Sequence, residues 1–391
     1  MSANDQRPHH RPTGARPLRG GWTDLQRQEG HSFLHWVDRE QRLLKGFEAL
    51  ATALRETLVE EIQTPADARD VWEAAPAVLS RCNDPATYTM RRTEVAYAWL
   101  HLLDRYVRTW LALEHLLLGR LLPMGRYGVR VLDVGTGPGP SAFSTHDFYV
   151  AMEDYARTAD APRWRQSPDI TCVEPVMNHI RHIVAERLAV KEAPRSVLCM
   201  TGGLHDFSTI LPTQERRQFE NSLRNEYEEY YNEERGEWDA DPIYTREQAN
   251  WEANTYRRYR LFTFSNFLTT LDTISSFQAN IEDILSDARA GSVLLIIGAQ
   301  GGSYPAIQKR MGRMADAGGF RRRNNAVKVA VAHAQLDQRL CDEIRWFYRY
   351  LKLLAGHLPA NTPCATKLRK ELEGDQPIKF ALSAVHAFRK S

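Results

Sequence analysis

The sequence predicts an α/β protein with a doubly wound, mostly parallel sheet that follows an N-terminal helical domain. The first observation is a change of pattern at Val129, where helical periodicity gives way to short apolar runs. The second is that these runs alternate with amphipathic helical segments along most of the remaining chain. Because apolar, β-branched runs are typical of strands buried on both faces, we expect helices on both sides of the sheet.

Length and composition agree with two domains. The chain has 391 residues, of which 43% are hydrophobic and 26% charged, and its formal net charge is +2. This balance argues against a largely disordered chain and against a strongly basic nucleic-acid coat protein. The five cysteines are widely spaced and form no Cys-x-x-Cys pair, which argues against disulfides, zinc and iron–sulfur clusters. We therefore expect no metal and a reducing compartment.

The apolar stretches and the N-terminus favour a soluble, cytoplasmic protein. Residues 1–28 are rich in Pro, Arg, Gly and His and have no apolar segment, which indicates a disordered tail and not a secretory signal. The most apolar long stretch, 95–122, is interrupted by charged residues and is too polar to span a membrane.

Residues 29–127 are expected to form the helical domain. Two apolar stripes with spacings of three, four and seven residues predict two long helical segments, with a shorter helix between them. Their aromatic residues follow the helical period, which favours a core over a base-stacking platform. The stripes comprise Phe33, Trp36, Leu43, Leu44, Phe47, Leu50 and Leu54, then Val95, Trp99, Leu102, Leu103, Tyr106, Trp110, Leu113 and Leu117.

Residues 128–391 are expected to form the sheet domain. The last predicted strand alternates apolar and polar residues, as an antiparallel strand near an edge would. Three stretches exceed a minimal α/β unit, at about 149–169, 212–260 and 324–372, and a helix is expected within the last. The predicted strands are 129–134, 170–173, 197–200, 261–264, 293–297 and 378–388.

The candidate ligand site is the glycine-rich turn after the first strand. The segment Val131–Pro140 reads VLDVGTGPGP. Glycine permits positive φ and a close approach of backbone to ligand, and open α/β sheets bind nucleotides at such turns. The spacing is neither the G-x-G-x-x-G of dinucleotide enzymes nor a P-loop. Asp133, at the strand tip, could meet an ammonium group or order the loop.

A second acidic residue follows the second strand, in the sequence Cys172-Val-Glu174-Pro175. A carboxylate at this position can accept hydrogen bonds from both hydroxyls of a ribose. The alternative is a solvated charge at the end of a strand. The acid and the glycine turn together favour a ligand that contains a nucleoside.

These segments resemble motif I and its successor in class I S-adenosylmethionine-dependent methyltransferases. The resemblance covers about 129–391 and is best between 129 and 185. It implies a Rossmann-like fold, S-adenosyl-L-methionine as cofactor, and methyl transfer. The implied cofactor-binding residues are Asp133, Gly135, Thr136, Gly137, Gly139, Glu174 and Pro175, with Ser265 and Asn266 in a segment similar to motif IV.

The sequence departs from the family's pattern in three places. The interval between Asp133 and Glu174 is about twice the usual one, which is why an insertion is expected at 149–169. In the family the acid that contacts adenine usually follows the third strand; the candidate here is Asp206, although Gly203 stands nearer to the strand. The prolines and tyrosine typical of enzymes that methylate base amino groups are absent beside Asn266, which argues against DNA-base chemistry.

The sequence leaves the methyl acceptor open, with a small molecule favoured over RNA or protein. The order of domains also faintly resembles the ribosomal small-subunit methyltransferase-like family, whose cysteine cluster is absent here. A non-catalytic or rRNA-directed binding or assembly factor is therefore the alternative function. The basic cluster at 309–323 is compatible with a phosphate-facing patch, but a charge run is more typical of a solvated face.

Acceptor recognition is expected from segments added to the sheet. The aromatic and acidic residues of 212–260 suit a lid over an uncharged or cationic acceptor, and the alternative is a charged helical hairpin packed away from the site. His205 and Tyr304 are candidate bases, with a structural role as the alternative for each.

Overall fold

The protein is described from a computed structural model. The tail expected at 1–28 lies mostly outside the described residues, although helix α1 (Asp24–Arg39) already begins within that range. The described residues are 24–80, 85–125, 128–174, 176–191, 204–207, 227–232, 237–242, 256–265, 270–302, 304–323, 327–329, 334–374, 378 and 383–391.

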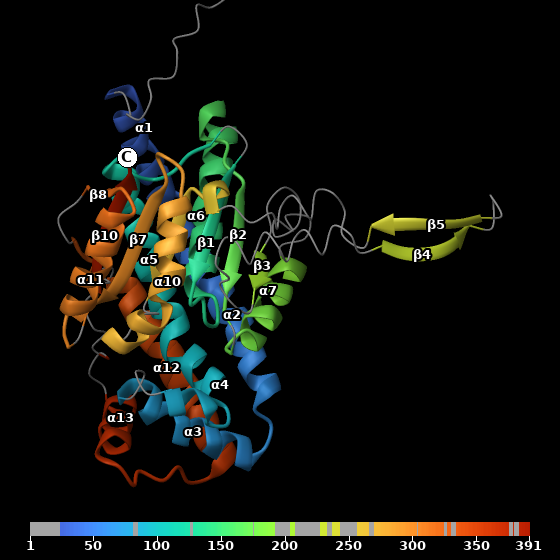
Figure 1. Ribbon diagram of the computed structural model, residues 1–391. Helices are drawn as coiled ribbons and strands as arrows, with labels where there is room; N and C mark the ends of the chain where they lie inside the picture. The colour runs from blue at the N-terminus through green and yellow to red at the C-terminus, as the bar shows by residue number, and fades with distance from the viewer. Residues whose placement is uncertain are drawn as a thin grey trace, which may run out of the picture.

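The core of the fold is an eight-stranded sheet of order β3-β2-β1-β6-β7-β10-β8, in which β9 also pairs with β10 (Figure 1). The first five strands in this order are parallel, and β10 is antiparallel to its three neighbours. This arrangement confirms the doubly wound, mostly parallel fold. The strands are β1 (Val129–Val134), β2 (Pro168–Val173), β3 (Leu204–Phe207), β6 (Leu261–Ser265), β7 (Val293–Ala299), β8 (Phe320–Arg322), β9 (Val327–Val329) and β10 (Ser383–Lys390).

One of the predicted strands differs in its bounds, and another lies outside the described residues. The third strand was expected at 197–200, which lies outside the described residues, and the strand that pairs with β2 is β3, further along the chain. The last strand begins at Ser383 and not at 378, and it runs to Lys390. The expected antiparallel orientation of this last strand is confirmed by its pairing with β7.

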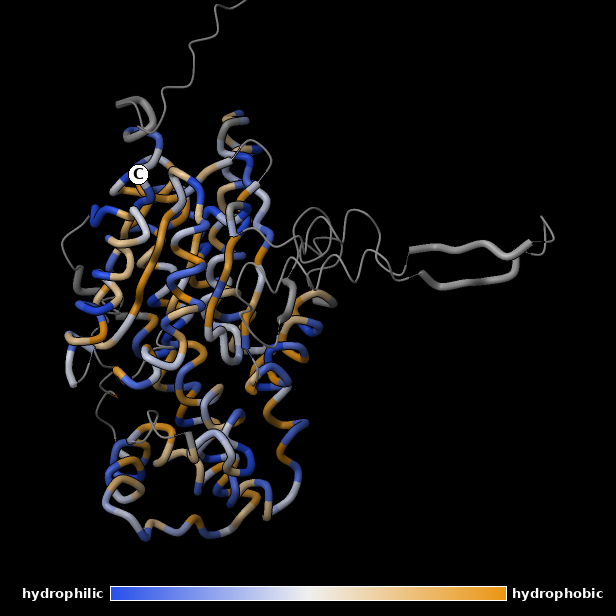
Figure 2. Tube along the Cα trace, in the orientation of Figure 1, coloured by the Kyte–Doolittle hydropathy of each residue, from blue (hydrophilic) through white to orange (hydrophobic). Residues whose placement is uncertain are grey.

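Helices cover both faces of the sheet because its strands are apolar on both faces. Figure 2 shows a continuous hydrophobic trace along β7. Residues that alternate along β1 and β7 belong to two buried clusters: Val131 and Leu295 to one, Leu132 and Leu294 to the other. The first cluster includes side chains of α5 (Leu103–Leu118), α6 (Pro140–Thr158) and α7 (His179–Lys191), and the second those of α10 (Leu271–Asp287) and α11 (Tyr304–Ala317).

The N-terminal helices share a core with one face of the sheet. A single buried cluster extends from Phe33 in α1 to Val385 in β10. Figure 1 shows β2 pointing toward the end of the molecule where α3, α4, α12 and α13 lie. The remaining helices are α2 (Arg42–Glu61), α3 (Pro65–Ser80), α4 (Thr93–Tyr97), the π-helix η2 (Ala98–Leu102), α12 (Ala334–Ala355), α13 (Pro363–Glu373), and the 3-10 turns η1 (Pro85–Thr89), η3 (Pro162–Trp164) and η5 (Tyr256–Arg258).

The stretches expected as insertions have different structures. Residues 149–169 form the second half of α6, η3 and the start of β2, and Trp164 of η3 packs on Phe33 of α1. Within 212–260 the described residues form an antiparallel pair of strands, β4 (Tyr227–Asn232) and β5 (Glu237–Pro242), and the segment 256–260. Tyr256 and Tyr259 of that segment are buried in the core, and the rest of the stretch expected as a lid lies outside the described residues. The predicted helix in 324–372 is α12, which packs on α3.

The helices that the structure describes include none that is long and apolar enough to cross a bilayer.

The buried carboxyl group of Glu114 in α5 makes stability depend on pH. Burial raises its pKa from 4.5 to about 7, although Trp110 Nε1 donates a hydrogen bond to it at 2.8 Å. Because the folded chain holds this proton more tightly than the unfolded chain, stability is lost as the pH rises between these two values.

We expect Glu114→Gln to raise stability at pH 8, by up to about 3 kcal/mol, and to change little at pH 4, where both states of the wild type are protonated. The amide oxygen of glutamine keeps the bond from Trp110. Thermal unfolding of the two proteins at both pH values measures the effect, and an equal difference at pH 4 and pH 8 would contradict it.

Candidate functional site

The site lies where the order of the sheet reverses. The chain adds β2 and then β3 on one side of β1, and it continues with β6 on the other side. In open α/β sheets, ligands bind outside the carboxyl ends of the strands at such a reversal. The glycine turn 135–139 connects the end of β1 to α6 and therefore occupies this position.

All three glycines of the turn have left-handed backbone. Their φ angles are 68° at Gly135, 56° at Gly137 and 95° at Gly139. A side chain on Gly139 would collide with Phe143 and Arg181, whereas the nearest atoms to a Cβ on Gly137 lie 3.7 Å away, in Met177 and Tyr97. Gly139 is thus required by packing, whereas a Cβ on Gly137 would only make ordinary van der Waals contact with two side chains.

Asp133 orders the turn from below. Its carboxylate accepts hydrogen bonds from Ser141 Oγ of α6, at 2.5 Å, and from Thr263 Oγ1 of β6, and it is almost completely buried. Burial raises the pKa of this carboxyl group despite these donors. Of the two roles that the sequence leaves open for Asp133, these contacts support the ordering of the loop.

Glu174 holds the same turn from the side of β2. Its Oε2 accepts a hydrogen bond from Gly137 N–H at 2.9 Å, and its Oε1 accepts from the N–H groups of Val176 and Met177 at 3.0 and 3.1 Å. A carboxylate has about four acceptor positions, so one on Oε2 is left for a ligand. Because Glu174 is 7% exposed, a solvated charge at the strand end is excluded.

Two helices enclose the turn. Tyr97, the last residue of α4, lies against Gly137 together with Met177. From α7, Arg181 is completely buried and donates a hydrogen bond from Nη1 to the Gly137 carbonyl at 2.7 Å. Glu94 of α4 accepts from Ile180 N–H at 2.8 Å, which joins α4 to the start of α7. The helical layer therefore supplies one wall of the site.

The charges around the turn favour a cationic ligand. Burial raises the pKa of both Glu94 and Asp133, and Glu174 raises that of Glu94 further, while the positive charge of Arg181 acts against these shifts. A positive group in the space above Gly137 would stabilise the ionised carboxylates. The start of α6 is also a poor phosphate site, because Pro140 has no N–H and Ser141 Oγ already donates to Asp133.

The other predicted site residues divide into three groups. Thr136 donates its hydroxyl to the Asp133 carbonyl at 2.8 Å and so braces the turn, and Ser265 is buried at the end of β6. Pro175 and Asn266 lie outside the described residues. Asp206 does not follow the third strand as expected, since β3 continues through it to Phe207 and pairs it with Cys172.

The two candidate bases are not adjacent to the turn in the described contacts. His205 lies in β3, where only the backbone is described. Tyr304 opens α11, and its ring lies so close to Gly298 of β7 that a Cβ there would stand 2.7 Å from it. This packing supports the structural role for Tyr304.

Glu94, Tyr97 and Arg181 are site residues that sequence reasoning missed. A signal for Arg181 was present, because it stands four residues after Met177, next to the buried stripe of α7, where an arginine is out of place. Glu94 and Tyr97 lie beside the start of the second apolar stripe, and nothing in the sequence shows that this part of the helical layer meets the glycine turn.

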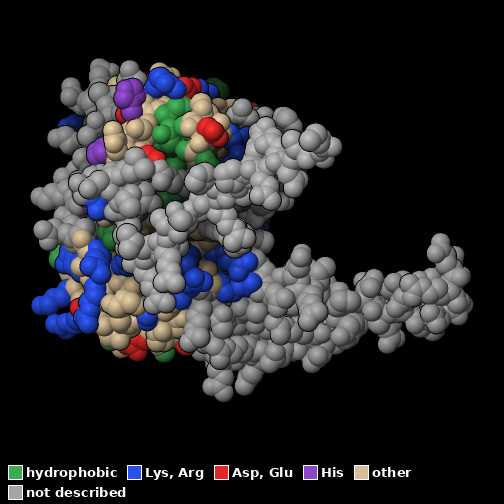
Figure 3. All heavy atoms as spheres, turned by 90° about the horizontal axis from the view of Figure 1, so that it is seen from above, with side chains coloured by type: hydrophobic (Ala, Val, Ile, Leu, Met, Phe, Trp, Pro, Cys, Tyr) green, Lys and Arg blue, Asp and Glu red, His purple; other side chains and the backbone are tan. Residues whose placement is uncertain are grey.

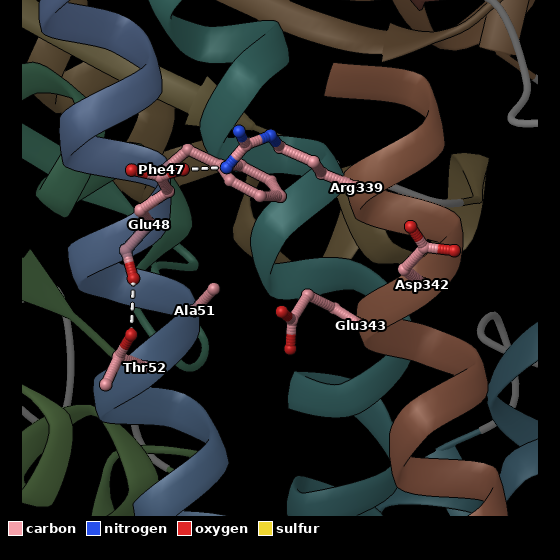
Figure 4. A pocket seen from close by; sticks show the side chains of 7 residues that line it. All are labelled: Phe47, Glu48, Ala51, Thr52, Arg339, Asp342 and Glu343. Atoms are coloured by element: carbon pink, nitrogen blue, oxygen red, sulfur yellow. Dashed lines mark hydrogen bonds and ion pairs between the residues drawn. The ribbon is translucent and has the colours of Figure 1, made fainter. Parts of the chain in front are cut away.

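A groove of about 440 Å³ lies elsewhere, between α2 and α12 (Figure 4). Its lining is mostly charged, and ion pairs join the two helices across it: Arg339 with Glu48, and Arg55 with Glu343. None of its lining residues belongs to the glycine turn or contacts it. The groove is therefore best explained as a bridged helix–helix interface. It is lined by Phe47, Glu48, Ala51, Thr52, Arg339, Asp342 and Glu343.

The basic cluster is divided between the two edges of the sheet: Arg310 of α11 donates to Ser275 Oγ at the start of α10, on the carboxyl side, whereas residues 321–323 lie at the amino edge. Residues 321–323 are exposed, and β8 pairs with the last residues of β10, which end at the amino edge of the parallel strands. Figure 3 looks onto this end of the molecule and shows Lys and Arg side chains gathered on part of it. Arg260, Arg289 and Arg389 add to this edge and repel one another. A ligand in the glycine turn cannot reach the exposed arginines of this edge.

No group of three or more His, Cys, Asp or Glu side chains within the described ranges could hold a metal ion.

The chain is similar to several solved structures of transferases, with low scores. No family model and no curated protein matches it. The structure of phosphoethanolamine N-methyltransferase 2 of Haemonchus contortus has 12% identity and a TM-score of 0.35, over 76% of this chain and 57% of that one. The structure of the CurJ carbon methyltransferase has 12% identity and a TM-score of 0.33, over 93% of this chain and 71% of that one. The cyclopropane synthase MmaA2 of Mycobacterium tuberculosis has 10% identity and a TM-score of 0.32, over 72% of this chain and 82% of that one.

Proposed function

We propose that this protein is an S-adenosylmethionine-dependent methyltransferase that binds its donor in the turn 135–139. The observation that carries the proposal is the bond between Gly137 N–H and Glu174. This bond supports the proposal because it joins the ribose-binding acid of the resemblance to Gly137, where a Cβ would meet no atom closer than 3.7 Å. The spare acceptor position on Glu174 Oε2 would receive a ribose hydroxyl.

The charges at the turn support this donor over a dinucleotide. S-adenosylmethionine carries a sulfonium and an ammonium group, and the carboxyl groups of Glu94 and Asp133 would be stabilised by positive charge. A nicotinamide dinucleotide would bring two phosphates to a helix start that lacks one N–H. The donor supplies an activated methyl group, so the protein's task is to align the acceptor and exclude water.

The protein's own residues can perform that task. Asp133 fixes the turn to β6 and α6, and Arg181 fixes the Gly137 carbonyl from α7. Tyr97 and Met177 close the space above Gly137 and would keep water from the bound donor. We infer a small-molecule acceptor in preference to RNA, because the exposed arginines of residues 321–323 lie at the amino edge of the sheet, opposite the turn. The alternative function is a binding factor that holds the same ligand without turnover.

Glu174→Gln is expected to weaken binding of S-adenosylhomocysteine by roughly 10- to 150-fold, since one charge-assisted bond and the fit to Gly137 N–H are lost. The amide presents an acceptor to only one side, so an N–H of the turn or of α7 would face an NH2 group. Isothermal calorimetry measures the change, with Glu186→Gln on the exposed face of α7 as the control. Equal affinity of Glu174→Gln and wild type would remove Glu174 from the site.

Turnover separates the enzyme from the binding factor. Wild-type protein incubated with methyl-labelled donor and a fractionated cell extract should transfer label to the low-molecular-mass fraction. Binding of the donor without any transfer to small molecules, protein or RNA would support the binding factor and contradict the enzyme.

A further inference from the structure

One continuous helical segment, formed by α4, η2 and α5, carries a polar face into the site. Its backbone is right-handed helical across both junctions, at Ala98 and at Leu103. The opposite face is packed, since Trp99 Nε1 donates to the Ile344 carbonyl of α12 at 3.0 Å. The polar residues follow spacings of three and four, as one helix face requires; they are Glu94, Tyr97, His101, Asp104 and Arg108.

Both ends of this face are attached to the carboxyl edge of the sheet. At one end Tyr97 lies against Gly137, which follows β1. At the other, Arg108 Nη1 donates to Ser383 Oγ at 2.6 Å, and Ser383 pairs with Ala299 at the end of β7. In the sheet, β6 and β7 lie between β1 and β10. His101, between the two attachments, therefore faces the ends of β6 and β7.

The helix is irregular at His101. Residues Ala98–Leu102 form a π-helix. An inserted π turn is energetically unfavourable and occurs frequently at functional sites, because it redirects a side chain without breaking the helix. Here the π turn is centred between Tyr97, at the donor turn, and the buried pair of Asp104 and Arg108. This observation is independent of the contacts at the glycine turn.

The surroundings of His101 keep its imidazole neutral. Its ring meets the ring of Tyr97 edge-on, with 5.0 Å between centroids, and part of its surface stays exposed. Burial and the charge of Arg108 lower its pKa to about 4, so the imidazole is neutral at neutral pH. Asp104 and Arg108 neutralise each other through a bidentate pair, with bonds of 2.7 and 2.9 Å.

We propose that the methyl acceptor binds between this helix face and the ends of β6 and β7, and that His101 is the catalytic residue that accepts its proton. This inference rests on the proposed function. An acceptor oxygen forms a bond to the donor's methyl carbon as the carbon–sulfur bond breaks, and the electron pair of that bond stays on sulfur. The hydroxyl proton moves to a ring nitrogen of His101 and then to solvent.

The acceptor class is an uncharged molecule with a hydroxyl group. Asp104 and Arg108 are paired with each other, and the guanidinium of Arg105 lies 4.7 Å from the centre of the Tyr97 ring, so this stretch favours an uncharged substrate over a cationic one. A hydroxyl oxygen that receives a methyl group becomes a strongly acidic oxonium, for which a weak base suffices. An alkylammonium acceptor would need a much stronger base.

The first test locates His101 without using activity. Diethyl pyrocarbonate modifies neutral imidazoles, and peptide mass spectrometry gives the rate at each histidine. Saturating S-adenosylhomocysteine should slow modification of His101 at least about tenfold and leave the exposed His357 unchanged. If calorimetry shows that S-adenosylhomocysteine is bound but the rate of His101 modification is unchanged, the inference about His101 is wrong, while the proposed function still stands. Failure of the ligand to bind would overturn the proposed function.

The second test uses His101→Gln with His357→Gln as its control. Label transfer from methyl-labelled donor to the low-molecular-mass fraction of a cell extract should fall at least about 100-fold in His101→Gln only. The dissociation constant of S-adenosylhomocysteine should stay within about threefold of wild type, which also shows that the variant is folded. Wild-type transfer by His101→Gln would contradict its role. Label that hydriodic acid does not release as methyl iodide would contradict a hydroxyl acceptor.

Discussion

Replacing Gly137 by valine is expected to weaken binding of S-adenosylhomocysteine at least about 100-fold, or about 2.8 kcal/mol. The Cβ alone would lie 3.7 Å from Met177 and Tyr97, and the two methyl groups of valine would extend into the space between them. The methyl donor would contact the backbone of the turn at this position. Isothermal calorimetry measures the loss.

Gly356→Val is the matched control for this variant. Gly356 follows α12 and has a φ of 70°, and a Cβ added to it would have nothing within 4 Å. Both variants therefore carry the cost of a side chain in left-handed backbone, about 1–2 kcal/mol, but only Gly137→Val fills the site. Thermal unfolding should show a similar loss of stability in both. Equal donor affinity in the two variants would show that the turn has only a structural role.

Removing the guanidinium of Arg108 is expected to destabilise the protein by about 3–5 kcal/mol. Asp104 is 3% exposed and Arg108 6%, and their pair is bidentate, with a further bond to Ser383. Burial already raises the pKa of Asp104 to about 6 despite the pairing. In Arg108→Ala the carboxylate would be left buried without its partner. Urea unfolding followed by tryptophan fluorescence measures the change.

The double variant Asp104→Leu with Arg108→Met should recover most of that stability, because it removes both charges and keeps the volume. Recovery would show that the cost lies in the uncompensated charge. A double variant as unstable as Arg108→Ala would contradict this explanation and point to the bond with Ser383 instead.

Most of the sheet could be predicted from the sequence because its strands are apolar runs. The runs at 129–134, 261–264 and 293–297 correspond to β1, β6 and β7, with bounds that differ by at most two residues. The strand that pairs with β2, Leu204–Phe207, was not predicted, since the run chosen for the third strand, 197–200, is more apolar; that run lies outside the described residues. An edge strand beside one neighbour needs less apolar character than a central strand, so hydropathy is a poor guide there.

The donor half of the candidate site follows from local sequence, and the other half does not. The glycine turn and Glu174 are read from consecutive residues beside predicted strands. Arg181, Tyr97 and His101 reach the site through packing between helices and sheet, over long intervals of sequence. The π turn at Ala98–Leu102 has no sequence signal that we recognise. The apolar stripe through this region correctly predicts a helix. It identifies the face that packs in the core, but it does not show what the polar face of the helix contacts.

Calorimetric titration of the wild-type protein with S-adenosylhomocysteine tests the central claim most directly. We expect saturable binding of one molecule per chain and no binding of a nicotinamide dinucleotide at the same concentrations. Because the ligand binds only the folded protein, it should also raise the free energy of unfolding, by about 2.7 kcal/mol when its concentration is 100 times the dissociation constant. Absence of S-adenosylhomocysteine binding at millimolar concentration, or preferential binding of the dinucleotide, would contradict the assignment of the turn 135–139 as a methyl-donor site.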